Sequence, residues 1–87
     1  MKIKEGFLLR KVANEHVVMP VGQASTLLNG FIKLNSTSVV LWKLLEKGAE
    51  KAELTAALQD EYGIDAEQAR EGVEAFLAPL LQVGCIE

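Results

Sequence analysis

The sequence predicts one α+β domain, in which a three-stranded antiparallel sheet is followed by three helices. Apolar residues up to Leu34 form short β-rich runs between turn residues, which is typical of strands. From Asn35 onward they recur every three or four residues, which is typical of helices. The chain has 87 residues, 49% of them hydrophobic and only two of them proline, so we expect a single domain over residues 1–87.

The runs Phe7 to Val12 and His16 to Val21 predict the first two strands. They are separated by residues 13–15, a connection of hairpin length. Pro20 has no N–H group, so it is expected near the end of its strand or facing an edge.

The polar stretch Gly22 to Gly30 predicts a loop, and its two leucines, Leu27 and Leu28, are expected to anchor it to the core. Phe31 to Leu34 then predicts a short third strand. Ile32 and Leu34 should lie on one face of it, with Phe31 and Lys33 on the other. A sheet of three strands leaves at least one edge strand open to another chain.

Asn35 or Ser36 is a suitable N-cap for the first helix, because either side chain accepts a hydrogen bond from a free N–H group of the first turn. The stretch Val39 to Leu45 is apolar nearly all the way round, so this helix should be the most buried. Gly48 is expected to end it. Trp42 lies midway along the apolar stretch, which favours a core position over a ligand-stacking one.

A second helix is predicted from about Lys51 to Tyr62, where Gly63 stops it. Asp65 followed by Gln68 resembles a capping box and begins a third helix. Pro79 falls within this helix and is expected to kink it or to end its regular part. The spacing of apolar residues predicts a continuous core face made of Ala69, Val73, Phe76, Leu77, Leu80 and Leu81.

The residues that could support catalysis or bind a metal are isolated. His16 is the only histidine and has no second ligand at a suitable spacing. Cys85 is the only cysteine, which excludes an internal disulfide and predicts a small buried apolar side chain. The sequence contains no glycine-rich phosphate loop. We therefore expect a protein that is not an enzyme and that holds no cofactor and no metal.

The charge and the apolar runs exclude two further classes of partner. The formal net charge is −3, which is unfavourable for binding nucleic acid. No apolar run approaches the roughly 20 residues of a membrane span, and the start of the chain lacks the apolar region of a signal peptide. Together with the single cysteine, these features lead us to expect a soluble cytoplasmic protein.

A set of short motifs extends from Phe7 to Ile86 in a characteristic order. It consists of Val18, Pro20, Gly30, Leu34-Asn35, Trp42, Leu45, Gly48, Leu58, Tyr62, Asp65, Val73, Phe76-Leu77, Leu80 and Gly84. Their order and spacing resemble the coenzyme PQQ synthesis protein D (PqqD) family. The resemblance implies a winged-helix-like domain that serves as a recognition element for ribosomally made, modified peptides.

The resemblance also implies a way of binding. Members of the family bind the leader of a precursor peptide as an extra strand on the third strand, in a groove walled by the third helix. They deliver it to a modifying enzyme, which is a radical S-adenosylmethionine (SAM) protein in the cofactor pathway. Carried over to this sequence, the residues for main-chain pairing are Phe31, Ile32, Lys33 and Leu34, and those lining the groove are Ala69, Arg70, Val73 and Leu77.

Three residues depart from the family pattern. Glu50 stands where a threonine cap is expected, so the start of the second helix should be less well held. Cys85 replaces a leucine or isoleucine after the glycine, which is a conservative change in size. Pro79 could reshape the far end of the groove.

Other functions stay open on the sequence alone. A winged-helix DNA-binding regulator shares the fold type, but the third helix offers only Arg70 against Glu67, Glu71 and Glu74. A regulatory subunit that docks on an enzyme without touching its substrate is a further alternative. A bare strand edge also fits a homodimer or an intramolecular lid.

Overall fold

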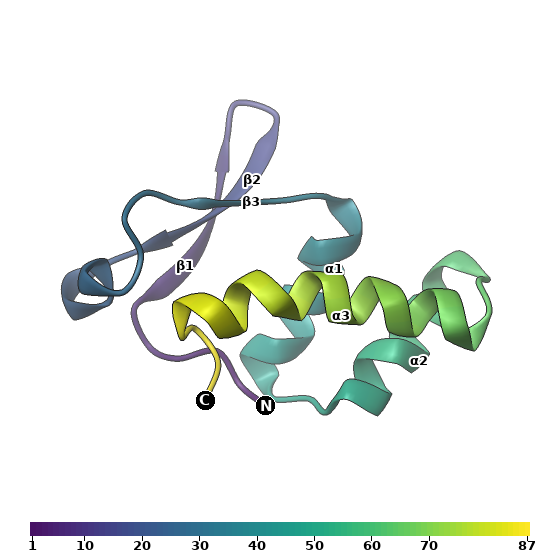
Figure 1. Ribbon diagram of the computed structural model, residues 1–87. Coiled ribbons are helices and arrows are strands. Elements are labelled where there is room, and N and C mark those ends of the chain that lie inside the picture. The colour runs from purple at the N-terminus through teal and green to yellow at the C-terminus, as the bar shows by residue number, and fades with distance from the viewer.

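Three antiparallel strands and three helices follow one another along the chain, which confirms the predicted α+β order (Figure 1). The computed structural model describes all residues, 1–87. The elements are β1 (Phe7–Val12), β2 (Glu15–Pro20), a short 3-10 helix η1 (Gly22–Thr26), β3 (Ile32–Leu34), α1 (Ser36–Lys47), α2 (Lys51–Tyr62) and α3 (Ala66–Val83).

The sheet has the strand order β1-β2-β3, so β1 and β3 are its two edges. Val12 pairs with Glu15, which leaves a two-residue hairpin loop in place of the expected three residues. Ala13 in this loop has φ 57°, a left-handed conformation that is rare for a residue with a side chain. Pro20 is the last residue of β2, as its missing N–H group predicts. The third strand begins at Ile32, one residue later than expected.

The connection between β2 and β3 is more ordered than a plain loop, because it contains η1 with Ala24 buried. Leu28 packs against the core as expected. Leu27 does not, since 48% of it is exposed. Only one of the two leucines therefore anchors this segment.

Side chains hold the start of each helix. Asn35 Oδ1 accepts a hydrogen bond from the Ser38 amide, and Asp65 Oδ1 accepts one from the Gln68 amide, both at 2.8 Å. The expectation of a loosely held second helix is wrong. Glu53 Oε1 accepts from the Glu50 amide at 3.1 Å, and the Met1 ammonium group donates to Glu50 Oε1 at 3.0 Å. These two contacts replace a threonine cap.

Pro79 lies inside α3, and the helix continues past it to Val83, so the expectation that it ends the regular helix is wrong. Gly84 follows with φ 87° and caps the helix by donating to the carbonyl oxygens of Leu80 and Leu81. None of the three helices is long and apolar enough to cross a membrane.

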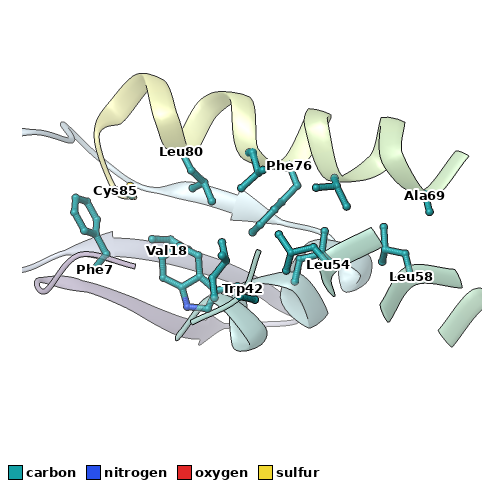
Figure 2. Packing of buried hydrophobic residues seen from close by; sticks show 14 of the residues in the cluster. Phe7, Val18, Trp42, Leu54, Leu58, Ala69, Phe76, Leu80 and Cys85 are labelled. Carbon is teal, nitrogen blue, oxygen red and sulfur yellow. The ribbon is translucent and has the colours of Figure 1, made fainter. Parts of the chain in front are cut away.

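The helices and one face of the sheet enclose a single apolar core. Figure 2 shows Ala69, Phe76 and Leu80 of α3 pointing toward residues of α1, α2 and the sheet. Trp42 is 0% exposed, which confirms its predicted core position, and its Nε1 donates to Glu46 Oε2 at 3.1 Å. Cys85 is also fully buried in this cluster, as its size predicts.

Candidate functional site

The open edge of β3 is the feature from which a binding site can be built. Figure 1 shows β3 lengthwise to α3, while β3 itself packs against β2 and α1. The tip of the β1–β2 hairpin instead projects away from the helices in Figure 1. Of the two sheet edges, β3 is therefore the one with a helix beside it.

One hydrogen bond between the first two strands shows which main-chain atoms of β3 face solvent. The Val21 amide donates to the Gly6 carbonyl oxygen at 2.7 Å, one step beyond the Phe7–Pro20 pair. Hydrogen-bonded and non-hydrogen-bonded pairs alternate along antiparallel strands. The odd-numbered residues of β2 therefore direct their main-chain groups to β1, and the even-numbered residues direct theirs to β3.

This parity separates the four strand residues that were expected to pair with a peptide. Ile32 lies opposite Val18 and Leu34 lies opposite His16, so the main-chain groups of Ile32 and Leu34 are used within the sheet. The side chains of both are half-buried and pack against the core. Lys33 directs its N–H and C=O groups away from β2. Phe31 directly precedes the strand, and the same alternation continued by two residues assigns its main chain to the open edge as well.

The four α3 residues that were expected to line a groove do not form a surface beside β3. Ala69, Val73 and Leu77 are 0–1% exposed and belong to the core cluster. Arg70 is exposed, but it lies four residues before Glu74, whose carboxylate binds Lys51 of α2 at 3.1 Å. Residues four apart share one face of a helix, so Arg70 lies on the flank toward α2.

The flank of α3 opposite Arg70 and Glu74 carries mostly small side chains. Gln68, Gly72, Ala75 and Pro79 recur at spacings of three and four, and so share one face. In Figure 1, α2 lies below α3 and β3 above it. A glycine within a helix costs about 1 kcal/mol relative to alanine. The spacing of these residues was visible in the sequence, but nothing there indicated which flank faces the strand.

No hollow of the surface is lined jointly by β3 and α3. The site is therefore an exposed strand edge without a preformed cleft. A Cβ added at Gly72 would lie 3.3 Å from Leu58 Cδ1, so a close contact within the chain accounts for this glycine. An extended peptide is the shape of ligand that such an edge accepts, because its main chain supplies the missing hydrogen-bond partners.

The sheet face turned away from the helices, hereafter the outer face, has apolar character next to the same edge. Val17 is buried there although it lies outside the core cluster. A hollow of about 210 Å³ is lined by Val12, Glu15, Val17, Met19 and Phe31. Phe31 is 55% exposed, and Lys33 Nζ binds Glu15 Oε2 at 3.1 Å with both side chains largely exposed.

The histidine, cysteine and acidic residues form no cluster that could hold a metal ion. His16 is half-buried on β2, and no group of three or more histidine, cysteine or acidic residues lies within ligating distance of a common point. Burial raises the pKa of the Cys85 thiol, and the charge of Lys4 only partly offsets this shift. A buried protonated thiol is a poor nucleophile.

The comparisons with known proteins agree with this description of the fold. The family model described as coenzyme PQQ synthesis protein D (PqqD) matches residues 15–86. No curated protein sequence matches the chain significantly.

Two solved structures are similar to the chain over nearly its whole length. The first is TbiB1 in complex with the TbiA(beta) leader peptide, at 23% identity and a TM-score of 0.78, covering 100% of this chain and 95% of that one. The second is lasso peptide synthetase B1 complexed with the leader peptide, at 18% identity and a TM-score of 0.73, covering 95% and 92%. At these identities the similarity establishes a shared fold.

Proposed function

The chain belongs to the PqqD family, and we propose that it is a non-catalytic protein that binds the leader of a ribosomally made precursor peptide and presents it to a modifying enzyme. The observation that supports this most is the open edge of β3, where Phe31 and Lys33 offer main-chain groups without a partner in the sheet. Two proteins of the same fold are described as complexes with leader peptides, which supports the same role here.

The leader would add to β3 as a fourth strand. The N–H and C=O groups of Lys33, and those of Phe31, would each form a pair of hydrogen bonds with one residue of the leader. The net contribution of each hydrogen bond is only about 0.5–1.5 kcal/mol. Main-chain pairing therefore fixes the path of the leader, and side-chain contacts on the two faces of the new strand must supply selectivity.

The flank of α3 defined by Gln68, Gly72, Ala75 and Pro79 supports this arrangement. We propose that this flank borders the added strand. Gly72, Ala75 and Pro79 have short or flat side chains, so a strand on β3 could direct one large side chain toward them without a clash. Burial of that side chain would stabilise the complex by about 25 cal/mol per Å² of apolar surface removed from water. We propose contacts with this flank in place of those first expected from Ala69, Val73 and Leu77, which are buried in the core.

The partner enzyme is proposed from family membership alone. A radical SAM protein acts on the bound precursor in the pathway after which the family is named, and we extend that assignment to this chain. The chain itself then needs no cofactor, because the chemistry takes place on the enzyme. Pairing of two copies through β3 is the rival use of the same edge, since it would occupy the Phe31 and Lys33 groups.

A binding titration tests the proposal. The short reading frames next to the gene supply candidate precursors, and the N-terminal segment of each is synthesised with a fluorophore. Anisotropy should show saturable binding of one segment and none of its scrambled form. If no candidate binds at concentrations up to about 1 mM, where only about −4 kcal/mol of binding free energy is required, the proposed function is wrong. Sedimentation at increasing protein concentration tests the rival dimer.

A further inference from the structure

The outer face of the sheet provides side-chain contacts next to the open edge. Phe31 and Lys33 lie on this face, because Lys33 is opposite Val17 and side chains alternate along a strand. They are also the two residues whose main-chain groups point to the edge. Any strand that pairs with their main chains must therefore place side chains directly beside theirs.

We propose that this pair forms a specificity site for an acidic residue and an apolar residue of the leader, spaced two apart with the acidic residue first. The apolar side chain would lie beside Phe31 and the carboxylate beside Lys33. This inference rests on the proposed function and specifies the class of leader that the edge selects.

The order of the two residues follows from strand geometry. Antiparallel addition continues the pattern of a sheet whose other pairs are all antiparallel. Residues directly opposite one another then share a face, with Cβ atoms about 4.5–5.5 Å apart. The leader runs against β3, so it meets Lys33 first, then Ile32, then Phe31. Its residue opposite Ile32 points to the other face, toward the α3 flank.

The chemistry at Phe31 favours an apolar neighbour. More than half of Phe31 is exposed, and it shares a hollow of about 210 Å³ with Val17 and Met19. An aromatic or aliphatic side chain on the added strand would cover the ring and extend this apolar surface. Cross-strand pairs of this type are among the favourable ones in sheets.

The chemistry at Lys33 favours a carboxylate. Its ammonium group has Glu15 as its one ion-pair partner, and 65% and 58% of these two side chains are exposed. An exposed pair of this kind holds its geometry weakly. A carboxylate on the added strand can therefore share or replace Glu15 at little cost, whereas a lysine or arginine there would place like charges opposite each other.

Selection from a displayed library of random 15-residue peptides tests the inference. The library is selected on the full-length chain, and the enriched peptides are sequenced. We expect an aspartate or glutamate two residues before an aromatic or aliphatic residue. When Lys33→Glu is the target of selection, the acidic position of the peptides should change to lysine or arginine. When Lys33→Gln is the target, the preference for a charge at that position should vanish. On Phe31→Ala the apolar preference should fall by about two- to fivefold, the range of one cross-strand pair.

Two matched controls should leave the selected pattern unchanged. Arg10→Glu makes the same charge reversal on the outer face, but on β1, two strands from the edge. Leu81→Ala removes an apolar side chain as exposed as Phe31, at 54%, but from α3. Circular dichroism verifies that each variant is folded.

The outcomes separate the inference from the function on which it rests. The parent could enrich peptides that bind Lys33→Pro more weakly but share no acidic residue two positions before an apolar one. In that case the inference is wrong and the proposed function stands. If no peptide is enriched above background, both are wrong. If the parent self-associates and Phe31→Ala abolishes this, the outer face is an interface between two copies, and the inference is again overturned.

Discussion

The amide of Val21 donates to the carbonyl oxygen of Gly6 at 2.7 Å, and this contact shows which way the main chain of β3 faces, although neither residue belongs to β3. It identifies the hydrogen-bonded pairs in the alternation along β1 and β2. The alternation passes through β2 to β3, where Lys33 is left facing the open edge. The proposed pairing of a peptide with β3 depends on this alternation.

Proline substitution should have opposite effects at neighbouring residues of β3. Lys33→Pro removes an N–H group that faces the open edge, so the domain should stay folded while peptide affinity falls by about 2- to 12-fold, the value of one hydrogen bond. Ile32→Pro removes a donor to Val18, and should destabilise the domain by about 1–3 kcal/mol. Urea unfolding and titration with one library-selected peptide measure both. Equal losses of stability and of peptide affinity in the two variants would show that the assignment of Lys33 to the open edge and of Ile32 to β2 is wrong.

Trp42 should be one of the largest single contributors to stability. Its ring is fully buried, so Trp42→Ala should lower the free energy of unfolding by about 3–5 kcal/mol. Glu46→Ala is the matched control, because it removes only the acceptor of the indole N–H and should cost about 0.5–1.5 kcal/mol. A loss below about 1 kcal/mol for Trp42→Ala would contradict its role in a tightly packed core.

The hairpin loop should be stabilised by a glycine at one position only. Ala13 has φ 57°, a conformation that is strained for alanine and free of strain for glycine. Ala13→Gly should raise the free energy of unfolding by about 0.5–1 kcal/mol. Asn14 has no positive φ, so Asn14→Gly should bring no gain. The two variants are compared by urea unfolding, and equal shifts would argue against a strained loop.

Cys85 should make the stability depend on alkaline pH. Burial raises the pKa of its thiol in the folded state above the ordinary value of 9.0. The folded chain then holds its proton to higher pH than the unfolded chain, so this contribution to stability is complete below the unfolded pKa and is lost as pH rises through the folded one. Cys85→Ala lacks this contribution. The free energies of unfolding of the parent and of Cys85→Ala should therefore converge as the pH rises above 9.0. A difference that stays constant with pH would refute the shift.

The sequence was sufficient to predict the order of the elements and most of the caps, because these depend on local patterns. Asn35 and Asp65 act through residues three positions away, and the buried face of α3 follows from its spacing. Leu81 was wrongly expected on that face, because 54% of it is exposed. The start of α2 could not be predicted in this way. Glu50 is held partly by the Met1 ammonium group, and that contact spans 49 positions along the chain.

The candidate site was harder to predict, because it depends on two tertiary relationships. The sequence suggested a loop of residues 13–15, whereas Glu15 pairs with Val12, and loop length sets the parity of every later pair. The way α3 meets α2 depends on tertiary packing, as the Lys51–Glu74 pair shows. Arg70 and Gly72 border the core stripe from opposite sides, so spacing alone could not choose between them.

Amide hydrogen exchange at single-residue resolution tests the central claim most directly. In the free protein the amides of Ile32 and Leu34 should exchange slowly, because they bond to β2, and the amide of Lys33 should exchange fast. A saturating concentration of a library-selected peptide should slow exchange at the Lys33 amide by at least about tenfold, while the exchange rates of the Ile32 and Leu34 amides change little. If the peptide binds and Lys33 still exchanges at its free rate, the peptide does not pair with the edge of β3.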